Sequence, residues 1–585
     1  MQVQNWIYRI TDGALARMIR LLAALMGFVV IALLYDMHTY TDLQNQEGME
    51  TAQLARNLAS GKGYTTQTIR PIDIHLLDKH VVGSSAKLIS QSVPDISNPP
   101  AYPILMSGVF KAVSFFQPKG QLPSTHVLEK WILGLNQGLF FIAALLLFVV
   151  AKEMFDSSVA WLSASLFALT DLYWQFTIAG LPTFLLIIFF LGAIWGLVRM
   201  LKYNNAPPSP STDLACLKFA ILVGLMVGAG ALTRYSFVFL AVPMTVFILV
   251  LFPRNRAKLT LGFLLSIIIV MGPWLSRNYM LTDTLLGSSG YAIFQQTPPF
   301  PDDTLERSLD IKLGLNRMEP GFYIDKLMSN THGIFSSDFS LFGGSWIFCF
   351  FLAGILIPFK NKNLSNLRLF LLGCLGLFIA VQALGQTHLS MENPRINSEN
   401  LLIVLAPLTF VFGTALFFTL LDQLTFEGFG SRGIVIGAFG FLISLPFIFV
   451  FLSPTVYPDK TPYTPYYIQR VTAWLSDDEV MISDVPFAVA WHGGHSCVWL
   501  PLDDKERFNQ LNAIKPIKGI YLTQKTTDGE VSQKAQNPFS WERFALEAWA
   551  RGEVPDKFPL THAPIGFMPN RIFISDRERW KTIAK

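Results

Sequence analysis

Long apolar runs alternate with short polar segments along most of this 585-residue chain. Each run is near the roughly 20 residues that a helix needs to cross the hydrocarbon core of a bilayer. The pattern therefore predicts a polytopic all-α membrane protein with about eleven transmembrane helices. We expect these spans near residues 18–35, 132–151, 158–175, 178–198, 216–232, 235–252, 259–275, 345–359, 368–385, 401–421 and 434–453.

Basic residues between the spans indicate the orientation of the chain. Three arginines precede the first span, and the positive-inside rule places this N-terminus in the cytoplasm. The first apolar run lacks a small-residue cleavage site, so we expect it to remain as a signal anchor. Alternation then predicts a multi-pass protein of the cytoplasmic (inner) membrane. Every predicted inner loop contains basic residues: Lys152; Arg199 and Lys202; Arg254, Arg256 and Lys258; Lys360, Lys362 and Arg368; and Arg432.

Composition agrees with a membrane protein and excludes other classes. Of its residues, 51% are hydrophobic and only 15% are charged, whereas about a quarter of the residues of soluble globular chains are charged. The net charge of +4 is small and sits in loop clusters, so no nucleic-acid partner is expected. Three of the four cysteines fall in apolar spans and Cys497 stands alone in the C-terminal region. No disulfide is expected in that region.

Polar segments divide the chain into a membrane domain, residues 1–453, and a C-terminal part. On the predicted outer side, the membrane domain contains a first loop, a larger loop and a short loop, at 36–131, 276–344 and 386–400. A Pro/Tyr-rich neck at 454–466 leads to a segment in which strand-like and helix-like stretches alternate. This segment, 467–585, is predicted to form a small extracytoplasmic α/β domain with strands at 480–484, 497–501 and 518–523.

The first outer loop contains two acidic residues at the start of an amphipathic segment. Residues 47–59 have leucines and alanines four apart, which predicts a helix lying at the membrane interface. Glu47 and Glu50 are three apart and would face one way near its N-terminus. One of them would serve as a general base, or both would only complement the helix dipole. Spacing alone favours the second interpretation.

Two other polar groups stand out. Asp171 lies at the edge of the third span, where an acid is costly and often functional, although it would also fit as an interfacial side chain in a tight loop. His492, His495 and Cys497 have the appearance of a metal cluster. A fourth ligand is missing and Cys497 begins a predicted strand, so no metal site is predicted there.

Several short motifs occur in a fixed order over residues 15–420. An acid after the first span precedes AQLARNLASGKGY and NPPAYP, and GALTRYSFVFLAVP, GPWLSRNY and ENPRIN follow. With these motifs the chain resembles the GT-C superfamily of membrane glycosyltransferases. It is most similar to the branch of protein O-mannosyltransferases and lipid A aminoarabinose transferases. Each motif is weak alone, and their common order makes the resemblance moderately specific.

The resemblance implies a catalytic acid in the first outer loop. Counting back from ARNLASG, the family's usual aspartate position falls on Glu47, with Glu50 a near rival and Asp42 the third choice. The tripeptide QEG at 46–48 departs from the acidic pair that is commonest in the family. Asp171 is the candidate for a second acid, and the resemblance leaves open whether a divalent metal ion takes part.

The resemblance also implies a donor sugar linked to polyprenyl phosphate, whose anionic group lies at the membrane surface. Arg234, Arg277 and Arg395 lie at the ends of spans at that depth. A guanidinium suits phosphate because its fork binds two oxygens and its charge is permanent. These three arginines are therefore candidate phosphate ligands, or else they contact lipid headgroups.

The expected function is glycosyl transfer in the cell envelope. A hexosyl- or pentosyltransferase would move a sugar from the polyprenyl-phosphate donor to a lipid, glycan or protein acceptor at the outer membrane face. The alternative is a transporter or flippase of lipid-linked glycans, which would predict internal repeats and broken or charged helices at the midplane. The chain has few charges within its spans and no repeat, which favours the enzyme.

Overall fold

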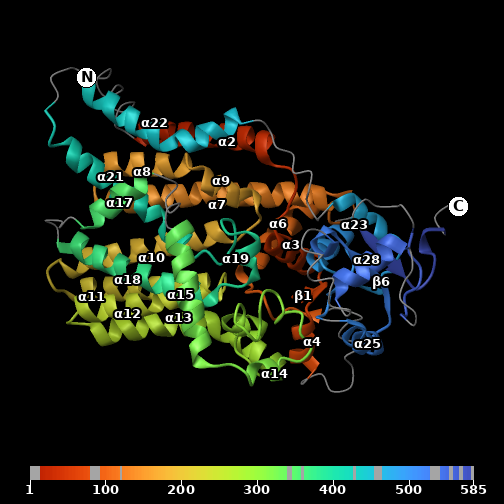
Figure 1. Cartoon of the computed structure of the whole chain (residues 1–585). Helices are drawn as coiled ribbons and strands as arrows, with labels where there is room; N and C mark the ends of the chain where they lie inside the picture. The colour runs from red at the N-terminus through yellow and green to blue at the C-terminus, as the bar shows by residue number, and fades with distance from the viewer. Residues whose placement is uncertain are drawn as a thin grey trace.

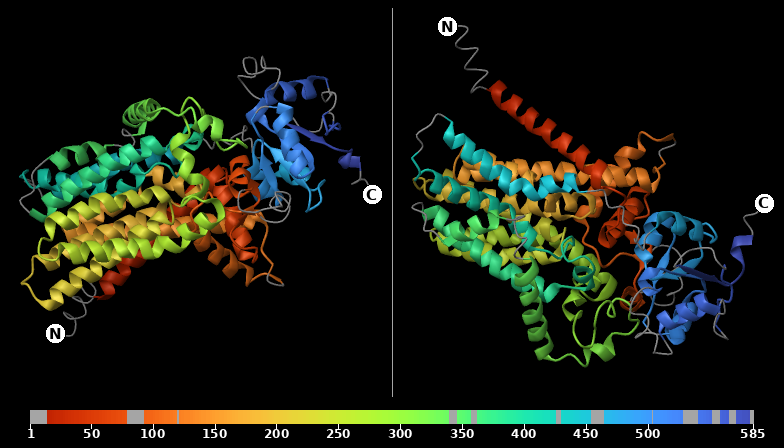
Figure 2. Two further views of the ribbon diagram at one scale, coloured as in Figure 1. Left: turned by 90° about the horizontal axis from the view of Figure 1, so that it is seen from below. Right: turned by 45° about the horizontal axis from the view of Figure 1, so that its top comes forward.

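Most of the chain forms long helices packed side by side in one bundle (Figure 1). At one end of the bundle, loops and a small sheet form a second layer, as both views of Figure 2 show. The computed structural model describes residues 14–78, 93–118, 121–338, 346–356, 362–425, 430–453, 464–502, 504–527, 540–551, 558–564 and 571–581.

Every span expected from the sequence coincides with an apolar helix. Among the described residues, seven apolar helices are long enough to cross a membrane: α2 (Ala14–Thr39), α7 (Thr125–Met154), α10 (Thr183–Asn204), α11 (Pro210–Ala231), α13 (Arg256–Thr282), α18 (Lys362–Gly385) and α22 (Ser431–Leu452). The shorter apolar helices are α8 (Ser157–Ala168), η2 (Tyr235–Leu240) with α12 (Ala241–Leu251), α17 (Ile347–Leu356) and α21 (Pro407–Leu421). The multi-helical architecture is confirmed, and the count of eleven crossings stays a prediction.

Two expected spans are interrupted for local reasons. The segment expected at 158–175 divides into α8 and α9 (Asp171–Ile178), with extended backbone at Thr170 between them. The segment expected at 401–421 divides into α20 (Leu402–Leu405) and α21, which has Pro407 at its first turn. Proline has no backbone N–H to donate to the preceding turn, so it begins a helix more readily than it continues one.

Helix α10 lies at the centre of the bundle, and glycines allow its neighbours to approach closely. A Cβ at Gly196 of α10 would lie 2.6 Å from Val223 of α11, and a Cβ at Gly224 of α11 would lie 2.3 Å from the carbonyl oxygen of Phe263 in α13. Such contacts leave no room for a side chain. Helices α2 and α22 run along the outside, and few of their residues are buried (Figure 1).

The second layer, which we call the cap, consists of the described residues of 40–124, 283–338, 386–401 and 464–581. Its first part contains α3 (Gln46–Ala59), β1 (Thr65–Thr66), β2 (Thr68–Ile69), α4 (Pro71–Asp78), β3 (Val93–Pro94) and α6 (Ala101–Ser114). The two loops between spans add η3 (Gly287–Phe294), α14 (Lys312–Leu315), α15 (Pro320–Gly333), η4 (Ile334–Asp338) and α19 (His388–Glu392).

The C-terminal part of the cap is built around a mixed sheet. The described strands β4 (Val480–Ser483), β5 (Cys497–Trp499) and β6 (Ile517–Leu522) occur where strands were expected, and β7 (Ile572–Ser575) is antiparallel to β6. The accompanying helices are α23 (Pro465–Thr472), α24 (Pro486–Ala488), η5 (Val489–Gly493), α25 (Asp504–Ile514), α26 (Gln524–Thr527), α28 (Trp541–Arg551) and η6 (Arg579–Lys581).

One strand of this sheet comes from the first outer loop. The order is β2-β5-β4-β6-β7, and Thr68 and Ile69 of β2 pair in parallel with Cys497 and Val498 of β5. Buried Ile69 and Val498 belong to the same apolar cluster as the central strands. Residues 467–585 therefore complete their sheet only together with the first loop.

Arg56 and Trp491 hold the C-terminal segment against the rest of the protein. The Arg56 guanidinium, on α3, donates to the backbone carbonyls of Ala490 and Trp491 at 2.6 and 2.8 Å and lies over the Trp491 ring. The Trp491 indole N–H donates to Glu129 of α7 at 2.7 Å. The cap is thereby fixed to the bundle at a buried contact.

Gly224→Ala is expected to lower the stability of the bundle by about 1–3 kcal/mol, because the added methyl overpacks the α11–α13 contact. The measurement is the thermal unfolding midpoint of the purified protein in detergent. Gly134→Ala is the control, since a Cβ there meets no described atom within 4 Å. Equal midpoints for the two variants would contradict this account of the packing.

Candidate active site

A cavity of about 640 Å³ lies where the cap meets the bundle. One side is apolar and comes from membrane helices: Val238, Phe239, Met271, Leu377, Ala380, Val381 and Leu384. The other side is polar and comes mainly from the cap: Glu47, Arg70, Ser97, Asn98, Ser288, Glu306, Thr387, Ser398 and Glu399. Arg234 lines the cavity from the connection between α11 and η2. The cavity can therefore accommodate a molecule with an apolar tail and a polar head.

Glu47 is fixed in the cavity wall by the start of α3. Asn45 caps this helix by accepting a hydrogen bond from the Gly48 backbone N–H at 3.1 Å, and its amide donates to the Ile396 carbonyl. The Glu47 carboxylate accepts hydrogen bonds from both the backbone N–H of Ser398, at 2.9 Å, and the Ser398 hydroxyl. The helix cap at Asn45 and the loop with Ser398, 351 positions from Glu47 in the sequence, thus hold the Glu47 carboxylate in a single orientation.

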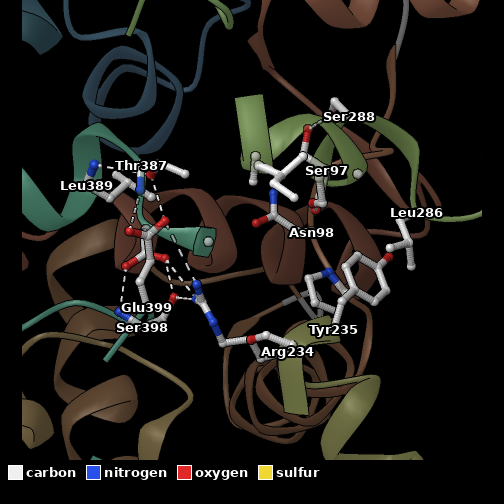
Figure 3. Close-up of a pocket in the computed structure, with 18 of the residues that line it drawn as sticks. Ser97, Asn98, Arg234, Tyr235, Leu286, Ser288, Thr387, Leu389, Ser398 and Glu399 are labelled. Atoms are coloured by element: carbon white, nitrogen blue, oxygen red, sulfur yellow. Dashed lines mark hydrogen bonds and ion pairs between the residues drawn. The ribbon is translucent and has the colours of Figure 1, made fainter. Parts of the chain in front are cut away.

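Arg234 lies between two carboxylates of this wall. Its guanidinium is 3.8 Å from Glu47 and 3.9 Å from Glu399, and it donates to the Ser398 hydroxyl (Figure 3). Glu399 is held in turn by Thr387, whose backbone N–H and hydroxyl donate to it at 2.9 and 2.6 Å. The Arg234 Nε is buried without a hydrogen-bond partner among the described residues. The Arg234 side chain as a whole lines the cavity, and it can meet a ligand there through its other nitrogens.

Glu50 belongs to a second ionic group of the same kind. Arg70 donates to Glu50 at 2.6 Å and to Glu306 at 3.0 Å, and all three side chains are largely buried. Arg70 and Glu306 line the cavity, whereas Glu50 lies behind Arg70. Glu47 and Glu50, the two acids predicted from the sequence, thus lie beside two different arginines, Arg234 and Arg70.

Burial raises the pKa of the Glu47 and Glu50 carboxyls, and the neighbouring Arg234 and Arg70 partly offset the rise. A carboxylate with a raised pKa accepts a proton more readily near neutral pH. Glu47 faces the cavity and so can meet a substrate, whereas the free oxygen of Glu50 is buried. Glu47 is the better placed of the two to act as a base.

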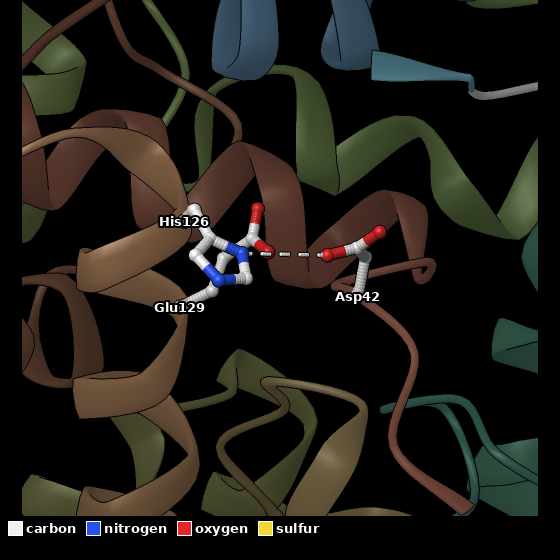
Figure 4. A group of neighbouring side chains, drawn as sticks. All are labelled: Asp42, His126 and Glu129. Carbon is white, nitrogen blue, oxygen red and sulfur yellow. Dashed lines mark ion pairs between the residues drawn. The ribbon is translucent and has the colours of Figure 1, made fainter. Parts of the chain in front are cut away.

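Asp42, the third candidate base, lies outside the cavity wall. Its carboxylate is 3.8 Å from the His126 ring, and Glu129 completes a group whose ligand atoms lie within 4.8 Å of one another (Figure 4). These three side chains have the chemistry of a divalent-metal site. Glu129 already accepts from the Trp491 indole, and Asp42 and His126 are substantially exposed. No other such group occurs in the described part of the chain, the segment with His492, His495 and Cys497 included.

The remaining predicted residues also lie elsewhere. Asp171 accepts hydrogen bonds from the Tyr35 hydroxyl at 3.0 Å and from Gln175, away from the cavity. Arg277 donates to the Asp95 carbonyl at 2.9 Å and stacks on Trp274. Arg395 is exposed, beside neither ionic group. Of the three predicted arginines, the structure brings Arg234 to the cavity.

Most of the polar cavity residues were missed by the sequence reasoning, among them Arg70, Glu306, Ser398 and Glu399. Ser398 and Glu399 follow the ENPRIN motif by one and two positions, so that motif was an available signal. Arg70 and Glu306 lie in stretches without a recognisable pattern. Their pairing depends on how the two loops fold against each other.

Asp73 is a further buried acid behind the polar wall. Its carboxyl accepts a hydrogen bond from the Ser97 hydroxyl at 3.3 Å and contacts Ser288, and both serines line the cavity. Burial raises the pKa of Asp73 to about 7, against opposing contributions from Arg70 and Ser288.

Comparison with known proteins confirms the resemblance to GT-C membrane glycosyltransferases. The sequence profile of the family described as dolichyl-phosphate-mannose-protein mannosyltransferase matches residues 135–276, which span α7 to α13. No curated protein sequence matches the chain.

Two solved proteins have a similar fold. The apo oligosaccharyltransferase of Archaeoglobus fulgidus superposes with a TM-score of 0.56 at 11% identity, over 91% of this chain and 72% of that one. ArnT from Cupriavidus metallidurans bound to undecaprenyl phosphate superposes with a TM-score of 0.53 at 9% identity, over 96% of this chain and 98% of that one. The complex of A. fulgidus AglB with an inhibitory peptide and a dolichol-phosphate superposes with a TM-score of 0.51 at 13% identity, over 91% of this chain and 71% of that one. At these identities the likeness concerns the fold.

Asp73 generates a prediction about stability and pH. A carboxyl whose pKa is raised on folding stabilises the protein below its unfolded pKa, near 4, and loses that contribution as pH rises through about 7. Asp73→Asn imitates the protonated form. Its unfolding midpoint is therefore expected to exceed that of the wild type by a few degrees at pH 8, and by little at pH 5.

The measurement is the thermal midpoint of both proteins across that pH range. Asp325→Asn, at an exposed position of α15, is the matched control and should give a constant difference. A loss of stability in Asp73→Asn that grows as the pH rises would mean that the carboxylate, and not the neutral acid, is the form that the fold requires.

Proposed function

We propose that this chain is a membrane glycosyltransferase that moves a sugar from a polyprenyl-phosphate carrier to an acceptor at the outer face of the cytoplasmic membrane. The observation that carries the proposal is the two-sided cavity, in which Arg234 and Glu47 lie between an apolar wall of membrane helices and a polar wall of the cap. The profile match and the likeness to two proteins solved with polyprenyl phosphates support the same donor class.

The donor would lie across both sides of the cavity. Its polyprenyl chain would contact the apolar residues of α18 and the η2–α12 segment, and its phosphate would meet Arg234. The two contacts of Arg234 with carboxylates are longer than hydrogen bonds. Phosphate oxygens would therefore gain charge-assisted hydrogen bonds without displacing close ones.

Transfer then requires a base on the acceptor side. In this proposal Glu47 takes the proton from the acceptor hydroxyl or amine while its oxygen or nitrogen forms the new bond to the anomeric carbon. The bond from that carbon to the phosphate oxygen breaks, and the phosphate leaves with the electron pair beside Arg234. Ser398 keeps the Glu47 carboxylate oriented, because it donates to both carboxylate oxygens.

We propose the side of the membrane on which the cavity lies from the distribution of basic residues. Basic loops at the far end of the bundle from the cap favour the cytoplasm for that end. The cap and its cavity would then face the outside of the inner membrane, where lipid, glycan or protein acceptors of the cell envelope are accessible. A flippase of lipid-linked glycans would bind the same donor but would not need a base.

Glu47→Gln is expected to lower transfer on the order of 10²-fold or more, because an amide cannot accept the acceptor proton. The measurement is the restoration of envelope glycolipids and surface polysaccharide in a strain that lacks the gene. Glu392→Gln is the matched control: Glu392 is a glutamate of the cap that pairs with Lys525 at 2.6 Å and lies outside the cavity wall. Full restoration by a well-expressed Glu47→Gln protein would exclude Glu47 as the base and leave the flippase as the better explanation.

Arg234→Ala is expected to weaken the binding of undecaprenyl phosphate to the purified protein about tenfold to a hundredfold, since hydrogen bonds to charged groups contribute roughly 1.5–3 kcal/mol. Arg234→Lys should recover part of the affinity, because it keeps the charge and loses the planar fork. Exposed Arg395→Ala is the control and should bind as the wild type does. If folded Arg234→Ala binds equally well, the phosphate lies elsewhere.

A further inference from the structure

Glu129 is a buried carboxylate that lies beside no cationic side chain. It belongs to the first turns of α7, its side chain is 2% exposed, and its Oε1 accepts the Trp491 indole N–H at 2.7 Å. The buried Glu50, by contrast, pairs with Arg70 at 2.6 Å. Among the described residues, the only basic group at ion-pair distance from Glu129 is the His492 imidazole, whose Nδ1 is 3.7 Å away. An imidazole with its ordinary pKa of about 6.5 is largely neutral above pH 7, so the buried charge of Glu129 is left without compensation, which is costly.

Two further side chains that can ligate a metal lie beside the Glu129 carboxylate. His126 precedes Glu129 by three positions on α7, so the two residues share one face of the helix. Asp42 belongs to the segment between α2 and α3, and its carboxylate is 3.8 Å from the His126 Nδ1. One ligand atom from each of the three side chains lies within 4.8 Å of the other two (Figure 4). Two carboxylates so close together repel each other, and a cation between them would remove the repulsion.

The spacing of these groups fits one metal ion after a small adjustment. Bonds from Zn²⁺ to carboxylate oxygen or imidazole nitrogen are about 2.0–2.2 Å long, so the ligand atoms around one ion lie roughly 3–4 Å apart. Asp42 and His126 can close the remaining distance, because their side chains are 37% and 63% exposed. A carboxylate has about four lone-pair sites, and that of Glu129 uses two, for the Trp491 indole and, at 3.5 Å, for the Leu43 N–H. It therefore keeps a site for a metal bond.

The donor set selects the class of ion. An imidazole with two carboxylates suits Zn²⁺ or Mn²⁺ better than Mg²⁺ or Ca²⁺, which prefer oxygen ligands alone, and Zn²⁺ binds such a set more tightly than Mn²⁺. Three protein ligands leave a further position for water on the exposed side. None of the three side chains lines the cavity between cap and bundle. An ion held by them is therefore separate from the donor and from the base proposed above.

We propose that Asp42, His126 and Glu129 bind one divalent transition-metal ion of the Zn²⁺ class, which fastens the segment between α2 and α3 to α7. Asp42 precedes Glu47 by five positions, and Glu129 accepts from Trp491, which holds the C-terminal segment. The bound ion thus joins the first outer loop, a membrane helix and the contact that fixes the C-terminal segment. Its role is to position these parts, and it stands whether or not the proposed transfer reaction is correct.

The test titrates Zn²⁺, Mn²⁺ and Mg²⁺ separately into the full-length protein in detergent. The protein has no polyhistidine tag and is first treated with a chelator, which is then removed. Calorimetry is expected to show one Zn²⁺ bound per chain, weaker binding of Mn²⁺ and the weakest binding of Mg²⁺. The thermal unfolding midpoint should rise by a few degrees at a free Zn²⁺ concentration about 100 times the Kd, because the ion binds the folded state. Mg²⁺ binding as tightly as Zn²⁺ would contradict a site with an imidazole ligand.

His126→Ala then assigns the ion to these residues. It is expected to lower the affinity for Zn²⁺ by at least about tenfold, since even the outer-shell partners of a metal contribute about 10–100-fold, and to remove the rise of the midpoint. His126 is exposed, so its truncation leaves the core intact. His332→Ala, at another exposed histidine of the cap, is the matched control and should bind Zn²⁺ as the wild type does.

Glu129→Gln tests the buried ligand. The amide oxygen can still accept from the Trp491 indole, while the negative charge is removed, so this variant should also lose the response of the midpoint to Zn²⁺. If wild-type protein binds no Zn²⁺, or if His126→Ala and Glu129→Gln bind it with the affinity of the wild type, the proposal is wrong. Binding that persists in both variants would place the ion elsewhere on the protein.

Discussion

Two carboxylates on helix α3, three positions apart, connect the separate parts of the cap to the bundle; Glu50 is buried and Glu47 is partly buried. Glu47 accepts from Ser398 in the last short loop and lies beside Arg234 at the end of a membrane helix. Glu50 accepts from Arg70, which also pairs with Glu306 of the large loop. Removing one partner of a buried ion pair costs far more than its presence contributes, because the remaining charge is left uncompensated. The Arg70 pairs, which are largely buried, therefore join the first outer loop to the large loop in a way that is costly to break.

The cavity is a consequence of this arrangement. The ends of membrane helices supply the apolar wall of the cavity, and the paired side chains supply its polar wall. The line where the two walls meet is therefore also the line where the cap meets the bundle. A ligand with a long apolar tail and a charged head matches both walls at once. Removing a carboxylate from water costs free energy of hydration. The same desolvation raises the pKa of the Glu47 carboxyl and makes its carboxylate a stronger base. Stability and chemistry are thus coupled in the same residues.

The C-terminal segment illustrates why the cap behaves as one unit. Its sheet includes β2 from the first outer loop, and Arg56 of α3 donates to the carbonyls of Ala490 and Trp491. A movement of this segment would be transmitted to α3, which contains Glu47. The C-terminal segment is thus packed against the helix that contains Glu47, although the segment does not line the cavity itself.

The sequence by itself determined the helices, their order and the side of the bundle on which polar loops gather. Apolar length and flanking charge are local properties, so each span expected from the pattern coincides with a helix. It also singled out Glu47 and Arg234, which line the cavity, through motifs close to them in the chain. Only the tertiary structure decided that these two meet, that Glu50 meets Arg70, and that Asp42, Asp171, Arg277 and Arg395 lie elsewhere. The partners of Glu47 and Glu50 lie between 20 and 351 positions away. Pairing over such separations is set by how loops pack on the bundle, which no local pattern of residues records.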